Sequence, residues 1–454
     1  VSQRKILFSC FKRKLTQEIR VVQLSGYVSE QAAYHHGEVS LQGAIVGMAQ
    51  DFVGSNNINL LQPNGQFGTR IMGGNDSASA RYIHTQLNPI VDLIYPSVDF
   101  PLLDYINDDG LIVEPKWYCP IIPMVLVNGM VGIGTGFSSN VPCHNVRHIV
   151  NWLKEKLQND METPATNVEV HYEGFNGTIV SVGSNKHLVK GVYEKVACKG
   201  NNKIRITELP VGYWTNDFKQ HLENLIADKK EQTVKDYDDM STDKTVDFTI
   251  TFAVGVVEKL EATKIDDICN GLEKLLKLYN TISTTNMHLF NANDQLRKYN
   301  SIYEIMEEYY TSRLELYEVR KKAQLDLLRS EYCKLNNKVK YIMENLEGTI
   351  DLRRKKKQDV IDMLMQKGYD VIDDDNEYKY LVKMSMDSVT EENVARLQKD
   401  AYDKKTQYEL LAKTTCKDIW LSELKTLERE IDSYFNKSTK KSEKKSKKIK
   451  LVMQ

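Results

Sequence analysis

The sequence feature that most constrains the fold is a long helical pattern over residues 298–346. Apolar residues recur there at helical spacing, and neither proline nor glycine interrupts them. At ~1.5 Å per residue, such a helix would be about 70 Å long. A second helical pattern spans residues 389–434. We therefore expect two long helices that pair as an antiparallel coiled coil, with a small helical cap at about residues 349–387 between them.

Two charged segments accompany this coiled coil. Asp373, Asp374 and Asp375 lie within the expected cap, and we interpret them as a solvated loop in preference to a metal site. Residues 437–450 contain eight lysines and one glutamate. We expect residues 436–454 to form a disordered basic tail, which either binds DNA, directs nuclear import or only keeps the chain soluble.

Residues 151–290 have a different character, because strand-like alternation is mixed with shorter helical patterns. Residues 151–158 and 217–229 are expected to be helices. These patterns indicate an α/β domain. The segment 236–239, with sequence DYDD, has the look of a metal-binding motif, but we interpret it as a solvated turn.

A glycine-rich stretch, residues 62–85, dominates the first 150 residues. Its glycines permit backbone conformations that other residues resist, and near its end Arg81 directly precedes Tyr82. A tyrosine hydroxyl has an ordinary pKa of about 10, so alone it is a weak nucleophile. A neighbouring guanidinium can stabilise the negative charge that develops at an attacked phosphate. We expect Tyr82 to begin a short helix, and residues 34–50 to form another.

Composition excludes some classes of protein and leaves others open. The 454 residues carry a net charge of −1, so the average does not indicate nucleic-acid binding. The seven cysteines include no CxxC pair, which argues against a zinc finger and suits reduced thiols inside a cell. No run of about 18 apolar residues is present that could span a membrane.

Three sequence blocks follow one another in the first half of the chain: SGYVSEQAAYHHGEVSL, the glycine-rich stretch and EPKWYCPIIPMVLVNGMVGIGTGFSSNVP. In this order they make the chain resemble the type IIA DNA topoisomerases of the eukaryotic topoisomerase II branch. The resemblance is to their breakage–rejoining core, with residue detail like that of the versions from large DNA viruses. It implies an α+β multidomain fold: a winged-helix DNA-binding domain with the catalytic tyrosine (1–150), an α/β tower (151–290), a coiled coil with a dimerising exit gate (291–435) and the tail.

The same resemblance implies roles for single residues. Tyr82 would attack a DNA phosphate and become joined to the 5′ end, while Arg81 stabilises the transition state. Ile133, presented between two glycines, would wedge between base pairs; the alternative is that Ile133 belongs to the core. One of the two neighbouring histidines would lie near the cleaved phosphate, and the residues do not decide which. The expected DNA-binding residues are Tyr34, His35, His36, Ser40, Gln62, Arg70 and Trp214.

Cofactors and partners also follow from the resemblance. The chain begins at Val1 and shows no metal cluster, so we expect Mg²⁺ to be bound by a region upstream and ATP to be used by the full-length enzyme. The expected partners are double-stranded DNA and a second copy in a homodimer, without a membrane. The location would be intracellular: the nucleus for a cellular protein, and the host cytoplasm or nucleus for a viral one.

Two other classes of protein remain as alternatives. A non-catalytic DNA-binding or architectural dimer could retain the same scaffold. A tyrosine recombinase also forms a tyrosine–phosphate link, but the blocks around Tyr82 do not resemble that class.

Overall fold

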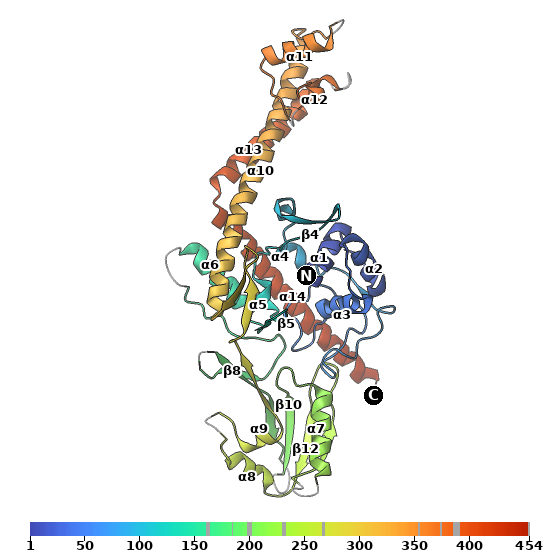
Figure 1. The fold of residues 1–454 in the computed structure, drawn as a ribbon, viewed down its shortest axis with the longest axis vertical. Coiled ribbons are helices and arrows are strands. Elements are labelled where there is room, and N and C mark those ends of the chain that lie inside the picture. The colour runs from blue at the N-terminus through green and yellow to red at the C-terminus, as the bar shows by residue number, and fades with distance from the viewer. Residues whose placement is uncertain are drawn as a thin grey trace. The chain divides into compact units, whose positions relative to one another are not determined.

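A computed structural model describes residues 1–159, 164–183, 185–197, 202–228, 233–265, 268–352, 355–372, 375–384 and 391–452, with the side chains of 391 and 436–452 left aside. The chain divides into two compact units. The first consists of Val1–Arg313 and Glu423–Gln454, and the second of Leu314–Ser422. Helix α10 (Ile302–Leu346) runs from the first unit into the second, and helix α14 (Cys416–Val452) returns (Figure 1).

Three helices open the first unit: α1 (Ser2–Arg13), α2 (Val21–Gln31) and α3 (Glu38–Ala49). Their shared core contains side chains with no exposed surface, among them Ile6 and Leu24. The expected helix over residues 34–50 therefore begins four residues late. Gly37 is its N-cap, and the residues before Gly37 form the turn between α2 and α3.

A two-stranded ladder joins the glycine-rich stretch to α2. Strand β1 (Ile19–Arg20) pairs antiparallel with β2 (His84–Thr85). The helix expected to begin at Tyr82 is therefore wrong, because the backbone after Tyr82 exchanges hydrogen bonds with neighbouring segments instead of with itself. His84, for example, exchanges both of its backbone hydrogen bonds with Asn64, at 3.1 and 3.0 Å.

Short elements then lead to a long amphipathic helix. In chain order they are α4 (Val91–Ile94), the 3₁₀ helix η1 (Ser97–Leu102), β3 (Tyr105–Asp108), β4 (Leu111–Pro115), α5 (Met124–Val127), β5 (Met130–Ile133), β6 (Ser138–Val141) and α6 (Val146–Gln158). Helix α5 is a single helical turn. Pro123 precedes it with φ −72°, which favours the start of a helix.

In residues 151–290, the expected tower, the described strands β7 to β13 form two antiparallel sheets. One has the order β11-β12-β10-β9 and the other β13-β8-β7. Helices α7 (Thr215–Ala227), α8 (Val256–Ala262) and α9 (Gly271–Leu275) accompany them. The strands are β7 (Thr178–Ser181), β8 (Lys186–Lys190), β9 (Val192–Lys195), β10 (Lys203–Glu208), β11 (Val234–Asp239), β12 (Phe248–Phe252) and β13 (Tyr279–Ser283).

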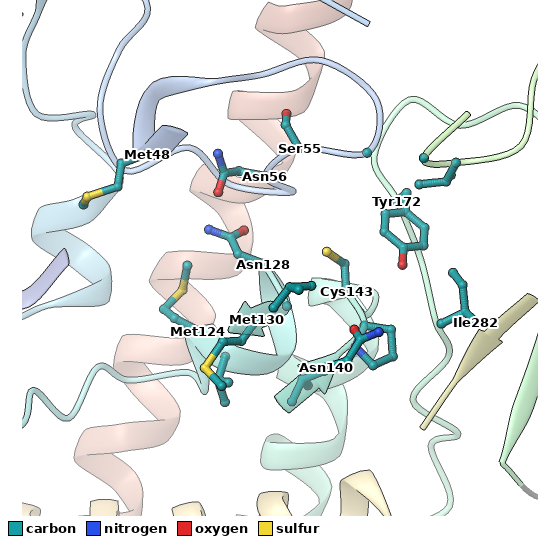
Figure 2. Close-up of a pocket in the computed structure, with 18 of the residues that line it drawn as sticks. Met48, Ser55, Asn56, Met124, Asn128, Met130, Asn140, Cys143, Tyr172 and Ile282 are labelled. Atoms are coloured by element: carbon teal, nitrogen blue, oxygen red, sulfur yellow. The ribbon is translucent and has the colours of Figure 1, made fainter. Parts of the chain in front are cut away.

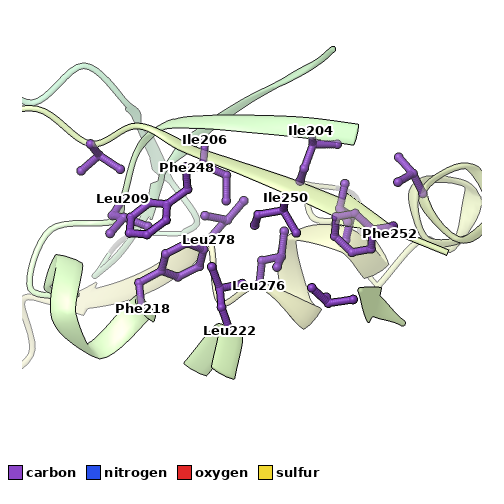
Figure 3. Close-up of a cluster of buried hydrophobic side chains, with 14 residues drawn as sticks. Ile204, Ile206, Leu209, Phe218, Leu222, Phe248, Ile250, Phe252, Leu276 and Leu278 are labelled. Atoms are coloured by element: carbon purple, nitrogen blue, oxygen red, sulfur yellow. The ribbon is translucent and has the colours of Figure 1, made fainter. Parts of the chain in front are cut away.

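The tower core lies between the four-stranded sheet and its helices, with Phe218 on α7 facing Phe248 on β12 (Figure 3). Their ring centroids are 5.0 Å apart, in an edge-to-face arrangement that aromatic pairs prefer. The segment 236–239, expected to be a turn, is instead part of the edge strand β11. Charged side chains suit an edge, because they discourage pairing with other chains.

The second unit is an antiparallel helix pair. Within it α10 runs beside α13 (Glu391–Lys413) and the start of α14, and contact positions descend on one helix as they rise on the other. Lys321 Nζ donates to the Ala412 carbonyl at 3.2 Å, and Lys404 pairs with Glu331 at 2.7 Å. The coiled-coil expectation is confirmed.

The second helix of this pair is interrupted, which its sequence pattern did not predict. Thr415 and Asp418 form a reciprocal cap at the start of α14: the Thr415 hydroxyl donates to Asp418 at 2.6 Å and accepts from the Asp418 N–H at 3.1 Å. Such a cap satisfies N–H groups at a new helix start. In the structure, one helix therefore ends at Lys413 and another begins at Cys416.

The helical cap at about residues 349–387, which lies between the long helices in sequence, has its own small core. It is built around Leu364 and Leu381, which are fully buried. The cap includes helices α11 (Lys357–Gln366) and α12 (Lys379–Val382). Asp373 and Asp374 lie outside the described residues, so the interpretation of the acidic triplet as a loop remains a prediction. Helix α14 continues to Val452, whereas we expected disorder from residue 436; the side chains of that segment are not described.

Candidate DNA-cleavage site

The glycine-rich loop is held closed by contacts between its own backbone segments. Gly68, with φ +96°, lies so close to Gly74 that a Cβ added there would stand 2.5 Å from the Gly74 Cα. A larger residue would force the two segments apart. Asp76 accepts from the Thr69 N–H at 2.8 Å and from its hydroxyl at 2.6 Å. Gln50, just after α3, donates to the Phe67 carbonyl at 2.9 Å.

The N-terminus of α2 fixes the two ends of the segment that carries Arg81 and Tyr82. The Val22 N–H donates to the Ala80 carbonyl, and the Val21 N–H donates to the Ile83 carbonyl, both at 3.1 Å. The first N–H groups of a helix have no partner within the helix. Here the tyrosine segment supplies those partners, so its backbone is anchored on both sides of the two residues.

Tyr82 and Arg81 point away from this anchored backbone. The Tyr82 side chain is 77% exposed, and Arg81 is also exposed. Ile83, by contrast, is buried and fixes the segment in the core. A side chain that is exposed on a firmly held backbone can approach an external phosphate in a fixed orientation, which favours nucleophilic attack.

The turn before α3 and the first turn of α3 form an exposed polar surface. His35, His36 and Ser40 are exposed, and Tyr34 is half-buried. His35 Nε2 lies 3.4 Å from Asp108 Oδ2, whereas His36 packs edge-to-face with the Tyr34 ring, at a centroid distance of 5.4 Å. The two histidines therefore differ in surroundings, and both remain accessible.

Arg70 has a different environment from the one we expected. It is 5% exposed, and its guanidinium donates to Glu208 Oε1 at 2.5 Å. The other carboxylate oxygen of Glu208 accepts from the Asn176 N–H at 3.1 Å. A buried, paired guanidinium cannot reach a phosphate without breaking this pair. We therefore correct the expected DNA contact: Arg70 fastens the glycine-rich loop to the tower.

Trp214 continues this junction between the loop and the tower. Its indole lies against Gly73, where an added Cβ would stand 2.3 Å from the ring, and against Phe52 at a centroid distance of 5.8 Å. The side chain is half-buried, so one part stays open. Gln62, also half-buried, accepts from the Gln86 side chain at 2.9 Å.

Ile133 stands at the end of strand β5 and is 92% exposed. The alternative reading of Ile133 as a core residue is therefore wrong. Strands β5 and β6 form a hairpin whose turn is closed by the Gly134 N–H, which donates to the Phe137 carbonyl at 2.8 Å. The hairpin is supported by β14 (Met287–Phe290), which pairs with β15 (Leu296–Tyr299). The Asn140 N–H, for example, donates to the Asn286 carbonyl at 2.7 Å.

A cavity of about 740 Å³ lies at the base of this hairpin. Figure 2 shows Met130 and Asn140 from the hairpin on one side and Ser55 and Asn56 on another. Ile282, from β13 of the tower, lines a third side of the cavity. The hairpin, the loop after α3 and the tower therefore meet around one hollow.

Sequence reasoning missed the buried polar residues that hold these parts together. Asn57 and Glu208 are each at most 5% exposed. Neither residue was assigned a role from the sequence. A single sequence gives no signal for such partners, because they lie 70 or more residues away.

The described residues do not form a metal site. Among them, no group of three or more His, Cys, Asp or Glu side chains is placed to hold an ion. The described residues therefore offer no such cluster for Mg²⁺. Among the described helices, none combines the length and hydropathy that a membrane crossing requires.

Comparisons with known proteins agree with this geometry. The family model for the A subunit of DNA gyrase/topoisomerase IV matches residues 1–425. The chain is 40% identical to DNA topoisomerase 2 of Arabidopsis thaliana and 38% identical to human DNA topoisomerase 2-beta, each over 95% of the chain. It spans 31% and 28% of the lengths of those proteins.

A solved structure extends the likeness to the fold. The chain superposes on the DNA-binding, cleavage and re-ligation domain of Plasmodium falciparum topoisomerase II with a TM-score of 0.85 and 36% identity, over 97% of this chain and 62% of the other. The chain belongs to the type II DNA topoisomerases. Within them it corresponds to the breakage–rejoining domain of the eukaryotic topoisomerase II branch.

Proposed function

We propose that this chain is the part of an ATP-dependent type II topoisomerase that cuts and rejoins duplex DNA, so that the enzyme relaxes and decatenates DNA. The observation that carries the proposal is the exposed Arg81–Tyr82 pair on a backbone anchored at both sides by α2. The family assignment supports it, since the relatives named above are DNA topoisomerases.

The proposed reaction is a transesterification. The Tyr82 hydroxyl oxygen attacks a backbone phosphorus, a tyrosine–phosphate bond forms to the 5′ end, and the bond to the 3′ oxygen breaks. The 3′ end leaves as a hydroxyl, which reverses the reaction when the strands are rejoined. Arg81 stabilises the charge on the phosphate oxygens. One phosphate ester replaces another, so rejoining requires no fuel.

The remaining accessible residues would position the duplex. Tyr34, His35, His36 and Ser40 would contact phosphates from the turn before α3 and its first turn, as a winged-helix module does. The open parts of Gln62 and Trp214 would add contacts beside the loop. Ile133 would enter between base pairs from the minor groove and bend the DNA, which costs a few kcal/mol of unstacking.

We propose that Mg²⁺ is bound by another region of the full-length protein and assists at the phosphate, and that ATP drives strand passage. We also propose that two copies form the active enzyme through the cap of the second unit, each cutting one strand. Work on DNA implies an intracellular location, the nucleus in a cellular setting, or the host cytoplasm or nucleus in a viral one.

The test is to trap cleaved DNA on the full-length protein, digest the complex and identify the residue that carries a nucleotide. We expect Tyr82. Tyr82→Phe should abolish cleavage yet change stability by no more than about 0.5 kcal/mol, because the side chain is exposed. A variant that still relaxes supercoiled DNA would refute the assignment. Intact binding and bending without any covalent complex in the wild type would favour the non-catalytic architectural dimer.

A further inference from the structure

Asn128, at the base of the β5–β6 hairpin, holds the segment that leads into the glycine-rich loop. Its side-chain oxygen accepts from the Ile58 N–H at 2.9 Å, and its side-chain nitrogen donates to the Ile58 carbonyl at 2.8 Å. One amide therefore satisfies both backbone groups of Ile58, as a neighbouring strand would. Figure 2 shows Asn128 between Asn56 and Met130, the first residue of the hairpin.

Asn57 strengthens the same junction from the opposite side. Its side-chain nitrogen lies 2.9 Å from the Val127 carbonyl and 3.1 Å from the His144 carbonyl. Its oxygen accepts from the Glu173 N–H at 2.8 Å. Consecutive residues 57 and 58 are thus bonded to consecutive residues 127 and 128. Because Asn57 is buried, losing these bonds would leave polar groups without water.

From this junction a short path leads to each of the two functional side chains. On one side Gly129, with φ +67°, turns the chain into β5; a Cβ there would stand 2.6 Å from the Val141 carbonyl. Ile133 ends that strand. On the other side, the backbone after Ile58 pairs at Asn64 with His84, two residues beyond Tyr82.

Packing alone does not hold the hairpin at this point. The cavity of about 740 Å³ is lined by hairpin residues and by Ser55 and Asn56, so one side of the hairpin base faces a hollow. Where packing is incomplete, side chains lose contact energy. The hydrogen bonds of Asn128, together with the bond from Asn57 to the Val127 carbonyl, then link the base of the hairpin directly to the loop segment.

We propose that Asn128, supported by Asn57, is a positioning residue that fixes the separation between Ile133 and Tyr82, and hence between the bent base step and the cleaved phosphate. The proposal rests on the function given above, in which Ile133 bends DNA and Tyr82 cuts it. A misplacement of about 1 Å in a reacting group can cost on the order of 100-fold in rate. Without the hydrogen bonds of this junction, DNA would still bind, but the bend would occur at several base steps instead of one.

The experiment compares four variants of the full-length protein with the wild type: Ile133→Ala, Asn128→Ala, Asn128→Asp and Asn270→Ala. Duplexes carry 2-aminopurine at single steps around the cleavage position, so that fluorescence reports unstacking at each step. Fluorescence anisotropy gives DNA affinity, and trapped complexes give the cleaved fraction. Asn270→Ala is the matched control, since Asn270 is also an asparagine with two side-chain hydrogen bonds, but it caps α9 in the tower.

We expect Asn128→Ala to bind DNA within about twofold of the wild type, because phosphate contacts supply most of the affinity. The fluorescence peak should broaden or vanish, and the cleaved fraction should fall at least about tenfold. Asn128→Asp keeps an acceptor for the Ile58 N–H, so its fluorescence peak and cleaved fraction should lie between those of the wild type and Asn128→Ala. Asn270→Ala should retain both the peak and the cleavage.

Each outcome decides the matter. If Ile133→Ala leaves the peak unchanged, Ile133 does not bend DNA, and the positioning role falls with that assignment. If Ile133→Ala removes the peak but Asn128→Ala does not, the bending function stands and the proposal is overturned. Equal loss of cleavage in Asn128→Ala and Asn270→Ala would show only a general stability effect and would also overturn it. If circular dichroism shows that Asn128→Ala is unfolded, Asn128→Asp decides by the same criteria.

Discussion

At the scale of single residues, the candidate site combines the exposed Tyr82, the proposed nucleophile, with buried polar neighbours. Tyr82 could be singled out from the sequence because the three blocks in and around the glycine-rich stretch resemble those of a known family; an arginine–tyrosine pair alone would not have distinguished it from a surface tyrosine. Its accessible position is set by Ile83, which is buried, and by the backbone of α2. The buried polar residues could not be predicted in the same way, because their importance depends on partners that only folding brings together.

His144 is one of these buried residues, and it makes stability depend on pH. Burial lowers its pKa to about 4, with His187 as an ionisable neighbour that acts in the same direction. The unfolded chain would bind a proton near the ordinary pKa of about 6.5. The neutral form therefore contributes stability above pH 6.5 that is lost as the pH falls towards 4.

We expect the wild type to lose about 2–3 kcal/mol more stability between pH 7 and 4.5 than His144→Gln, which cannot titrate. Urea denaturation at a series of pH values measures this difference. The Asp and Glu side chains titrate in both proteins and serve as the internal control. Parallel curves for the two proteins would show that His144 is not the group responsible.

At the scale of elements, sequence patterns predicted which segments are regular better than where they begin and end. The long helices and the tower strands were recognised from periodicity. The start of α3 and the break at Thr415 were not, because a glycine N-cap and a reciprocal cap override a continuing apolar pattern. The pairing of β1 with β2 was missed because two-residue strands carry no periodic signal.

Arg70 and Glu208 form a buried ionic link between the glycine-rich loop and the tower strand β10. We expect Arg70→Met to cost about 3–5 kcal/mol, because it leaves the Glu208 carboxylate buried without its partner. The double variant Arg70→Met/Glu208→Gln should recover at least half of that loss. Urea denaturation of the single and double variants gives the coupling. Purely additive losses would show that the two side chains do not depend on each other.

At the scale of the whole molecule, removing the second unit tests whether it carries the dimer contact. We expect replacement of Leu314–Ser422 by a short Gly/Ser linker to leave the first unit folded but monomeric, since the proposed dimer contact lies in the cap. Keeping Glu423 onwards preserves the ion pair of Lys154 with Glu428, at 2.9 Å. Sedimentation equilibrium measures the mass. A stable dimer would place the main contact elsewhere.

A mixed dimer tests whether the cleavage site is shared between the two copies. One copy of the full-length protein carries Tyr82→Phe, and the other carries a disrupted Mg²⁺ site. If each tyrosine uses the metal of its partner, one intact half-site remains and a single strand is nicked. Cleavage gels with end-labelled duplex distinguish nicked from intact strands. No cleavage at all would mean that each copy supplies both parts itself.

The return of α14 to the first unit also affects the order in which the protein folds during synthesis. Leu424 and Leu427 are fully buried, and Arg147 on α6 donates to Asp432 at 3.1 Å. The Tyr434 hydroxyl reaches the side chain of Asn59, close to the glycine-rich loop. The first unit therefore lacks part of its core until a segment made more than 100 residues after Arg313 has left the ribosome. A nascent chain stalled before Glu423 should expose α6 and rely on chaperones, although most residues of the first unit have been made.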